Sequence, residues 1–486
     1  MSANSKISLA VLLRVQGFLL FIEGVFMLLV LPVTYFHHGI NAFSMPFSAL
    51  ITVMTGFVLC FSTRKRKGQR LNHREGVITI CLSWLVLSVF GGLPFLLSKC
   101  VPNFTDAFFE ALSGFTTTGS TILTNIEMVP KDILLWRSMT QWIGGLAIIV
   151  FAVALIPFLS VGGMQLFMTE MNGINYDKLH PRIMHTAKRI WGLYLFFTLL
   201  ETLLLYWGDM DWFDALCHSL TTISSGGFST RTSSISGYSN YSQIVITFFM
   251  ILSGCNFTLL LITLVRNPMA LFKNEEFKHF LIMILGIGTL MAVALVFLEQ
   301  LSVGNAVRSA FFSVASVLTT TGFFVCDYTL WPVGLWSVLM LLMFIGACSG
   351  STSGGIKIIR HLIFTKNAFL ELKRIIHPNA VIPVKINKKS ISKSVIFKTM
   401  TFVFMYFFIF VIGTIILLTL GIDFNTSVGA SLATLSNLGT GIGSVGPFGT
   451  YAFLPQAAKW VLAIFMLMGR VELFTLISIF SKNFWK

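Results

Sequence analysis

Long runs of apolar residues recur along this sequence, and they restrict its fold more than any other feature. Each run holds about 20 residues, which is the length that an α-helix needs to cross roughly 30 Å of hydrocarbon. Ten runs have this character: Leu9–Tyr35, Phe43–Phe61, Val77–Leu97, Ile133–Phe158, Ile190–Trp207, Gln243–Val265, Phe280–Phe297, Trp331–Ile356, Phe397–Leu420 and Lys459–Phe480. The sequence therefore predicts an all-α polytopic membrane protein with ten spans.

The composition excludes a soluble globular protein, because 55% of the 486 residues are hydrophobic and only 11% are charged. The first run carries Arg14 and Glu23, and no small-residue cleavage site follows it. We therefore expect an uncleaved membrane helix rather than a secretory signal. The seven cysteines are scattered without the spacing of a disulfide framework or a metal site, so we expect reduced thiols.

The formal net charge of +15 is concentrated between certain spans. If the N-terminus lies inside, the basic clusters all fall in the cytoplasm: Arg64, Lys65, Arg66, Lys67, Arg70 and Arg74; Lys178, Arg182, Lys188 and Arg189; and the long segment Lys357–Lys398. This is the positive-inside pattern of membrane proteins. It predicts that both termini are cytoplasmic and that the basic loops contact anionic lipid or an acidic partner, not nucleic acid.

A repeat lies between the paired spans, in apolar stretches that are too short to cross a bilayer and are therefore candidate re-entrant half-helices. Asp106–Ser120 (DAFFEALSGFTTTGS) and Ser309–Phe323 (SAFFSVASVLTTTGF) are identical at eight of fifteen positions. Asp214–Phe228 (DALCHSLTTISSGGF) and Thr426–Thr440 (TSVGASLATLSNLGT) follow the same pattern. The repeat predicts four units of helix, half-helix with loop, and helix around a pseudo-fourfold pore.

A glycine occupies the same column of all four stretches: Gly119, Gly227, Gly322 and Gly439. One such glycine is explained by a helix C-cap and turn, but four in register are not. In the second unit the adjacent Gly226 leaves the register open by one residue. The repeat divides the chain into an N-terminal hairpin (1–68) and four pore repeats (69–170, 171–272, 273–378 and 379–486).

Four such loops around one axis predict an ion filter. Their backbone carbonyls can replace the hydration shell of a monovalent cation. Glycine lets the backbone turn its carbonyls inward, and the Thr and Ser hydroxyls tie the loop to its surroundings or add oxygens. Each half-helix would direct the negative end of its dipole toward the membrane centre, where a dehydrated cation is least stable.

Two further features point to a barrier beneath such a filter. Gly346–Gly355 is rich in small residues and interrupts a span, and irregular backbone at membrane depth is tolerable where it lines a water-filled cavity. The alternative is a kink or a packing face between helices. Arg470 lies near the centre of the last run, where a charge is costly and usually faces a cavity. Its alternative role is a salt bridge to a buried acid such as Glu23 or Glu201.

These motifs resemble the Trk/Ktr/HKT superfamily of potassium transporters, and the two extra N-terminal spans make the chain look most like the TrkH/TrkG-type membrane subunit of the bacterial Trk uptake system. The resemblance covers nearly the whole chain. It is carried by the stretches FTTTGS, SSGGFST, LTTTGF, SNLGTGIG, FIGACSGSTSGGIK (Phe344–Lys357) and MGRVELF (Met468–Phe474).

The resemblance implies a potassium selectivity filter made of Thr116, Thr117, Thr118, Gly119, Ser224, Ser225, Gly226, Gly227, Thr319, Thr320, Thr321, Gly322, Ser436, Asn437, Leu438 and Gly439. It implies K⁺ contacts at Thr117, Thr118, Ser225, Gly226, Thr320, Thr321, Asn437 and Leu438. It also implies an intramembrane gate made of Gly346, Ala347, Cys348, Ser349, Gly350, Ser351, Thr352, Ser353, Gly354, Gly355 and Arg470. Ser225 and Thr440 depart from the family, in which a branched apolar residue and proline are common, and this bears on the selection of K⁺ over Na⁺. Rb⁺ and Na⁺ are the further ions that we expect such a filter to admit.

The resemblance further implies a homodimer in the bacterial inner (plasma) membrane that associates with a cytosolic nucleotide-binding regulatory subunit. We expect K⁺ to be the transported substrate, flowing inward down its electrochemical gradient, with no bound organic cofactor and no enzymatic activity.

Three competing functions were weighed. The stretch GSTSGGIK is close to a phosphate-binding loop, but Ile356 separates the glycine from the lysine and no strand precedes it. A hydrolase with Ser349 as nucleophile lacks a histidine in the spans, since His361 and His218 are predicted on opposite sides. A secondary transporter that couples K⁺ or another solute, such as an organic substrate, to Na⁺ or H⁺ remains the alternative, although such folds usually show two repeats rather than four. Coupling would require acids near the filter, where the chain has Asp106, Glu110 and Asp214, which we interpret as charges at half-helix N-termini.

Overall fold

The computed structural model describes residues 8–36, 43–64, 72–155, 179–377, 379–380 and 382–485. Several sequence predictions lie outside these residues, namely the positions of Lys65, Arg66, Lys67, Arg70 and Lys178 and the repeat boundaries near residues 68, 170 and 378. The repeat boundaries stay predictions. The described chain is almost entirely helical, as the apolar runs predicted.

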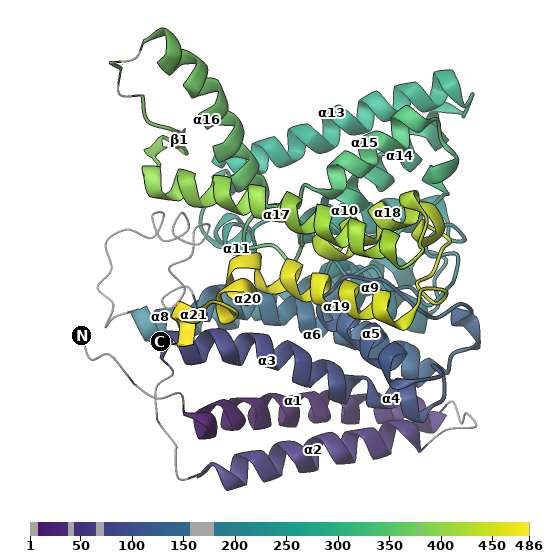
Figure 1. The fold of residues 1–486 in the computed structure, drawn as a ribbon. Coiled ribbons are helices and arrows are strands. Elements are labelled where there is room, and N and C mark those ends of the chain that lie inside the picture. The colour runs from purple at the N-terminus through teal and green to yellow at the C-terminus, as the bar shows by residue number, and fades with distance from the viewer. Residues whose placement is uncertain are drawn as a thin grey trace.

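The N-terminal hairpin and the first repeat form the purple and blue part of the molecule (Figure 1). The hairpin consists of α1 (Leu9–Phe36) and α2 (Ser44–Ser62). The first repeat consists of α3 (His73–Gly91), α4 (Leu93–Leu97), α5 (Phe104–Phe115), the 3₁₀ turn η2 (Ile126–Met128) and α6 (Lys131–Leu155). The hairpin helices lie side by side at one edge, and α1 packs against α3 and α6.

The second and third repeats follow the same plan. The second consists of α8 (Leu179–Tyr206), α9 (Trp212–Ile223), α10 (Asn240–Ser253), α11 (Phe257–Val265) and α12 (Ala270–Lys273). The third consists of α13 (Glu275–Leu298), α14 (Val303–Leu318), η4 (Tyr328–Leu330), α15 (Val333–Met343) and α16 (Ile358–Ile376).

A short antiparallel hairpin joins the third repeat to the fourth. Its strands are β1 (Lys385–Ile386) and β2 (Lys389–Ser390). The fourth repeat consists of α17 (Lys393–Thr419), α18 (Phe424–Ser436), η5 (Gly443–Val445), α19 (Gln456–Val471), α20 (Leu473–Ile479) and α21 (Lys482–Trp485).

Two predicted continuous spans are instead bent pairs of helices, which corrects the interpretation of Gln243–Val265 and Lys459–Phe480. α10 and α11 meet at 100°, and α19 and α20 meet at 115°. At the first break the Asn256 side chain accepts a hydrogen bond from the Leu259 amide (3.0 Å) and so begins a new helix. At the second break Glu472 has a φ of 70°, which no helical residue adopts.

Eight of the ten predicted spans correspond to helices of the described chain that are long and apolar enough to cross a membrane, once each bent pair is counted as one span. Six single helices of the described chain are long and apolar enough to span a membrane, and the two bent pairs make eight. The remaining two segments are α6, which carries charged residues, and α15, which ends at Met343 before the glycine-rich stretch. The end of α15 at Met343 agrees with the prediction that Gly346–Gly355 interrupts a span.

α16 and the β-hairpin project from the body at the end of the molecule where α1 begins and α21 lies (Figure 1). The Lys366 ammonium is 2.5 Å from a carboxylate oxygen of Glu275, which ties α16 to the start of α13. The projecting part carries much of the basic segment Lys357–Lys398. The orientation of this end toward the cytoplasm remains a prediction.

Candidate functional site: the filter loops and the gate segment

Four short helices, α5, α9, α14 and α18, point their C-terminal ends toward the four glycine loops, and each lies between two further helices of its repeat. Three of them begin at a side-chain cap: Asn103, Asp211 and Asp423 accept hydrogen bonds from the backbone amides of Asp106, Asp214 and Thr426. Such caps satisfy amides that a helix leaves free at its start. The sequence prediction of four half-helices is therefore matched in all four repeats.

The four glycine loops, which we call the filter loops, share one backbone conformation. The residue two positions before the column glycine has a positive φ of 52° to 55°, and the glycine has a φ of 77° to 87°. The first set is Thr117, Ser225, Thr320 and Asn437, and the second is Gly119, Gly227, Gly322 and Gly439. In the second loop Gly227, not Gly226, has this conformation, which settles the register that the sequence left open.

The loops also contact one another in a closed ring. A Cβ atom added to Gly119 would overlap the carbonyl oxygen of Gly226, and the same relation holds from Gly227 to Thr321 and from Gly322 to Leu438. Gly439 closes the ring against the carbonyl oxygen of Thr118. Each contacted oxygen belongs to the residue immediately before a column glycine. Glycine is needed at the four positions both for its positive φ and for this close approach.

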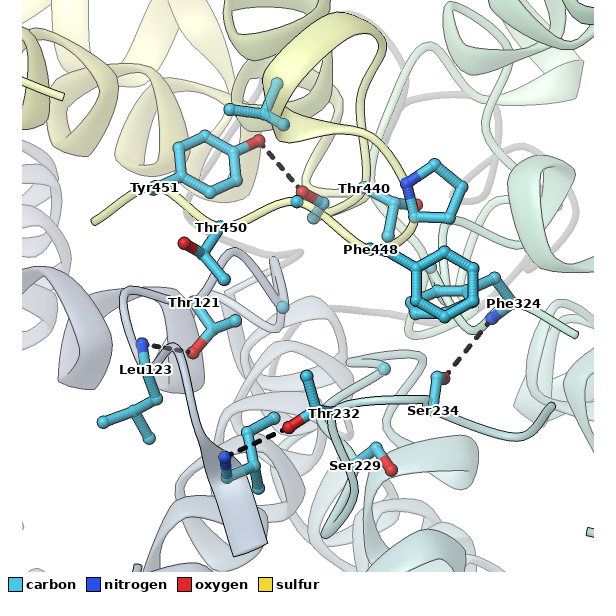
Figure 2. Close-up of a pocket in the computed structure, with 18 of the residues that line it drawn as sticks. Thr121, Leu123, Ser229, Thr232, Ser234, Phe324, Thr440, Phe448, Thr450 and Tyr451 are labelled. Carbon is cyan, nitrogen blue, oxygen red and sulfur yellow. Dashed lines mark hydrogen bonds between the residues drawn. The ribbon is translucent and has the colours of Figure 1, made fainter. Parts of the chain in front are cut away.

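A small cavity of about 60 Å³ lies over the ring, and all four column glycines line it. Figure 2 shows its walls, which include Thr121, Thr232, Thr440 and Tyr451 from the segments that follow the filter loops. The Tyr451 hydroxyl donates a hydrogen bond to the Gly439 carbonyl oxygen (2.9 Å). The cavity has the position expected for the mouth of a pore.

The filter hydroxyls mainly hold the loops in shape. Thr116 donates to the Leu112 carbonyl (2.7 Å) and its hydroxyl lies 2.8 Å from that of Thr118. Thr319 donates to the Ala315 carbonyl (2.7 Å), and its hydroxyl also lies 2.8 Å from that of Thr321. The two TTTG stretches thus repeat the same hydrogen bonds.

The glycine-rich segment Gly346–Gly355 is non-helical and lies against the other end of the filter loops. The Thr352 hydroxyl is 2.6 Å from the Ser225 hydroxyl, and the Gly354 amide donates to the Thr320 hydroxyl (2.7 Å). The gate segment, as we call these residues, therefore contacts the second and third loops at residues that precede the column glycine. The cavity is lined by the column glycines and the residues after them, so the filter loops lie between the cavity and the gate segment.

Arg470 is buried at the end of α19 and contacts the gate segment. Its guanidinium donates to the carbonyl oxygens of Thr352 (2.8 Å) and Gly144 (2.9 Å). In the part of the chain that the structure describes, Arg470 makes no ion pair, which argues against the alternative of a salt bridge to Glu23 or Glu201. The nearby Glu472 pairs with Arg360 instead (3.0 Å).

Three anchors of the gate segment were missed by the sequence analysis. Glu276 on α13 accepts hydrogen bonds from the amides of Ser349 (2.6 Å) and Ile359 (3.3 Å), and Asn256 donates to the Ser349 carbonyl (2.6 Å). The Lys357 ammonium donates to the Ser353 hydroxyl (2.9 Å). The sequence signal that could have found Glu276 was its position, as an acid just before the apolar run Phe280–Phe297.

Asp106, Glu110 and Asp214 were interpreted from the sequence as charges at half-helix N-termini. The structure corrects this interpretation, because all three also form ion pairs. Their partners are basic residues of other elements: Asp106 pairs with Lys459 (2.6 Å), Glu110 with Arg137 (2.7 Å) and Asp214 with Arg231 (3.3 Å). Arg137 lies inside the run Ile133–Phe158, where the sequence analysis overlooked it.

The hydrolase alternative finds no support in the contacts of its residues. The Ser349 hydroxyl lies 3.1 Å from a Glu276 oxygen. The two ring nitrogens of His218 lie 2.8 Å from the Asp214 carbonyl oxygen and 2.9 Å from the Ser229 hydroxyl. A nucleophile needs a base within hydrogen-bonding distance, and His218 has other partners.

Four repeats of helix, re-entrant helix and helix around a ring of glycine loops define a pore-loop membrane protein. The chain belongs to the TrkH family of cation transport proteins, because the family model matches residues 45–486. The Trk system potassium uptake protein TrkH of Escherichia coli K12 is 39% identical over 453 residues, which cover 92% of both chains. TrkG of the same strain is 33% identical over 474 residues, with 97% of both chains covered.

A solved structure supports the same relationship. The crystal structure of the potassium transporter TrkH from Vibrio parahaemolyticus matches with a TM-score of 0.90 and 33% sequence identity. The match covers 98% of this chain and 99% of that one. The predicted family and fold class are therefore confirmed.

Proposed function

We propose that this protein is a channel-like potassium uptake protein that conducts K⁺ inward through a filter of backbone carbonyls. The observation that carries the proposal is the closed ring in which each column glycine meets the carbonyl oxygen of the next loop. Such oxygens can replace the hydration shell of a monovalent cation. The relatives named as potassium uptake proteins support K⁺ as the transported substrate.

The ring oxygens of Thr118, Gly226, Thr321 and Leu438 are the central K⁺ contacts of this proposal. The carbonyls of Thr117, Ser225, Thr320 and Asn437, one residue earlier, form the next layer. These are the eight contact residues that the family resemblance implied. The negative dipole ends of α5, α9, α14 and α18 add to the stabilisation of a cation at this depth.

The gate segment and Arg470 control flow in this proposal. A positive charge 5 Å from a passing cation raises the energy of that cation by about 3 kcal/mol at an effective dielectric constant of about 20. Arg470 has no acidic partner among the described residues, so its charge is not cancelled locally. Movement of the gate segment together with Arg470 would remove both the steric and the electrostatic barrier.

The test is cation flux into proteoliposomes that contain the purified protein, with K⁺, Rb⁺, Na⁺ and Li⁺ compared under an imposed voltage and no other gradient. K⁺ and Rb⁺ flux that exceeds Na⁺ and Li⁺ flux is the expected result. Flux that requires an added proton or sodium gradient would overturn the passive mechanism.

Coupled transport is the second candidate, and one observation favours it. Glu23 and Glu201 are fully buried in α1 and α8, and their carboxyl oxygens have no hydrogen-bond partner in the described chain. Buried acids of this kind serve as proton sites in transporters. If coupling exists, Glu23→Gln and Glu201→Gln would abolish the dependence of K⁺ flux on a proton gradient. A passive pore would conduct K⁺ without that gradient in every variant.

The assembly belongs to the same proposal. It is a homodimer in the inner membrane with both termini cytoplasmic, bound to a cytosolic nucleotide-binding regulatory subunit. The projecting α16 and β-hairpin, which carry many basic residues, are the docking face that we favour.

A further inference from the structure

Two polar side chains of α6 reach across to the second filter loop. Arg137 and Gln141 are four residues apart, so they lie one above the other on the same face of the helix. Both are buried, with exposed fractions of 2% and 0%. α6 belongs to the first repeat, whereas the loop that they contact belongs to the second.

Gln141 holds the second loop on both sides of its column glycine. Its amide nitrogen donates to the Gly226 carbonyl oxygen (2.7 Å), and its amide oxygen accepts from the Phe228 amide (3.0 Å). The orientation of the Gln141 amide is fixed by these partners, because one is an acceptor only and the other a donor only. Gly227 therefore lies between two backbone groups that one side chain holds.

Arg137 holds the same loop one residue further along. Its guanidinium donates to the Ser229 carbonyl (2.8 Å) and lies over the Phe228 ring, 3.5 Å from the ring centroid. The bond to Glu110 (2.7 Å) fixes Arg137 from α5 and balances its charge. Together Arg137 and Gln141 contact every residue from Gly226 to Ser229 except Gly227.

The contact explains why the second loop has two adjacent glycines. Gly227 has the positive φ of the column, whereas Gly226 is not in the left-handed region. The nearest atoms to a Cβ added at Gly226 all belong to the Gln141 amide, which it would overlap. Gly226 is therefore required by the space that Gln141 occupies, and not by its backbone conformation.

We propose that Gln141 is a positioning residue that determines cation specificity by fixing the Gly226 carbonyl of the filter ring. This inference rests on the proposed function. In the described chain no protein donor bonds to the other three ring oxygens, those of Thr118, Thr321 and Leu438, so one quarter of the ring is held from behind by a side chain. Without that bond the Gly226 carbonyl loses its attachment to α6, and the position of this oxygen around the ion is no longer fixed from behind.

The test measures the K⁺ to Na⁺ permeability ratio of purified variants in proteoliposomes. Gln141→Ala is expected to lower the ratio by about tenfold, because a buried carbonyl and a buried amide lose their partner. Gln141→Met keeps a side chain of similar length but removes the donor, so it should also lower the ratio even if the alanine variant folds poorly. Ser138→Ala on the same helix is the control, since its hydroxyl bonds within α6 to the Leu134 carbonyl.

A double substitution separates this role from a general effect on folding. Gly226→Ala should impair insertion or flux in the wild-type background and be tolerated in the Gln141→Ala background, where the space is free. Equal impairment in both backgrounds, or a wild-type ratio in Gln141→Ala and Gln141→Met, would overturn the inference. Absence of K⁺ selectivity in the wild-type protein would instead overturn the proposed function, so the two failures are distinguishable.

Discussion

Ser225 is the residue at which this chain joins its filter to its gate segment. Its hydroxyl lies 2.6 Å from the Thr352 hydroxyl and donates to the Ser253 hydroxyl (3.1 Å). Thr352 in turn offers its carbonyl to Arg470 (2.8 Å). A branched apolar side chain at position 225, which is common in the family that the sequence resembles, would have no hydroxyl for this contact. The departure therefore adds a polar link between the filter and the gate segment.

We expect Ser225→Ala to raise the basal K⁺ flux of the isolated protein. The substitution removes the contacts to Thr352 and Ser253, and loss of the one that reaches the gate segment corresponds to about 1 kcal/mol, so the ratio of the closed to the open arrangement should fall by a factor of about five. Flux into proteoliposomes without any partner protein measures this directly. Ser219→Ala on α9 is the matched control, because that hydroxyl bonds to the Ala215 carbonyl of its own helix. Equal basal flux in the two variants would remove Ser225 from gating.

Arg470 supports a second prediction at this scale. Arg470→Ala should raise basal flux by about tenfold or more, because both the charge and the two carbonyl contacts are lost. Arg470→Lys keeps the charge but has no planar fork to reach both carbonyls, so its flux should be intermediate. Flux at or below the wild-type level in Arg470→Ala, with normal insertion, would contradict the proposed barrier.

At the scale of elements, one helix holds the gate segment at two points. The Glu276 carboxylate of α13 accepts from the amide of Ser349, inside the segment, and from the amide of Ile359, just beyond it in α16. The amide of Asn256, at the break between α10 and α11, bonds to the Ser349 carbonyl. Residues 350–358 therefore lie between two anchored points, and the bent span supplies a further anchor at Ser349.

We expect Glu276→Ala to loosen this segment. The buried amides of Ser349 and Ile359 would lose their acceptor, which costs about 1–3 kcal/mol for each unsatisfied group. Hydrogen exchange of residues 344–357 should become faster, and basal flux should rise. Glu275→Gln is the control, because that neighbouring carboxylate pairs with Lys366 of the projecting α16. Unchanged hydrogen exchange in Glu276→Ala would show that contacts other than those to Glu276 hold the gate segment.

Some of these elements could be predicted from the sequence and others could not. The four half-helices and the glycine column were predictable, because a positive φ and a close approach restrict Gly119 and its counterparts to glycine. The gate segment was visible as a run of small residues that no continuous helix would carry. The bends at Asn256 and Glu472 were not predicted: neither break contains proline, the Ser253–Gly254 pair before Asn256 was an unused signal, and Glu472 is an unusual residue at a positive φ.

The contacts behind the filter were beyond the sequence for a different reason. Gln141 and Arg137 were predicted only as part of a span, and their partners lie 85 and 92 residues further along the chain. Which face of α6 meets the second loop depends on how the repeats pack. The second filter's double glycine was the only trace of this contact, and its meaning required the structure.

At the scale of the whole molecule, the four repeats form a ring that closes between the first and the fourth. α5 packs against α19, and the Lys459 ammonium lies 2.6 Å from a carboxylate oxygen of Asp106, although the two residues are 353 positions apart. Both side chains are buried, with exposed fractions of 6% and 7%. The ring of filter loops closes at the same seam, where Gly439 meets the Thr118 carbonyl.

We expect Asp106→Ala to destabilise the protein more than any change to a surface pair. Removing one partner leaves the Lys459 charge buried and unpaired, which costs about 3–5 kcal/mol. Thermal unfolding in detergent should shift clearly to lower temperature. Glu371→Ala is the control, since its pair with Arg374 lies on exposed parts of α16 and contributes less than about 1 kcal/mol.

The double variant Asp106→Ala/Lys459→Ala tells whether the pair stabilises the seam or only satisfies its own charges. If the cost of the single change comes from an unpaired buried charge, removal of both residues should restore much of the lost stability. K⁺ selectivity should then be retained, because the glycine and carbonyl contacts of the filter ring do not involve either side chain. If the double variant remains as unstable as Asp106→Ala and also loses selectivity, the ion pair itself holds the first and fourth filter loops together.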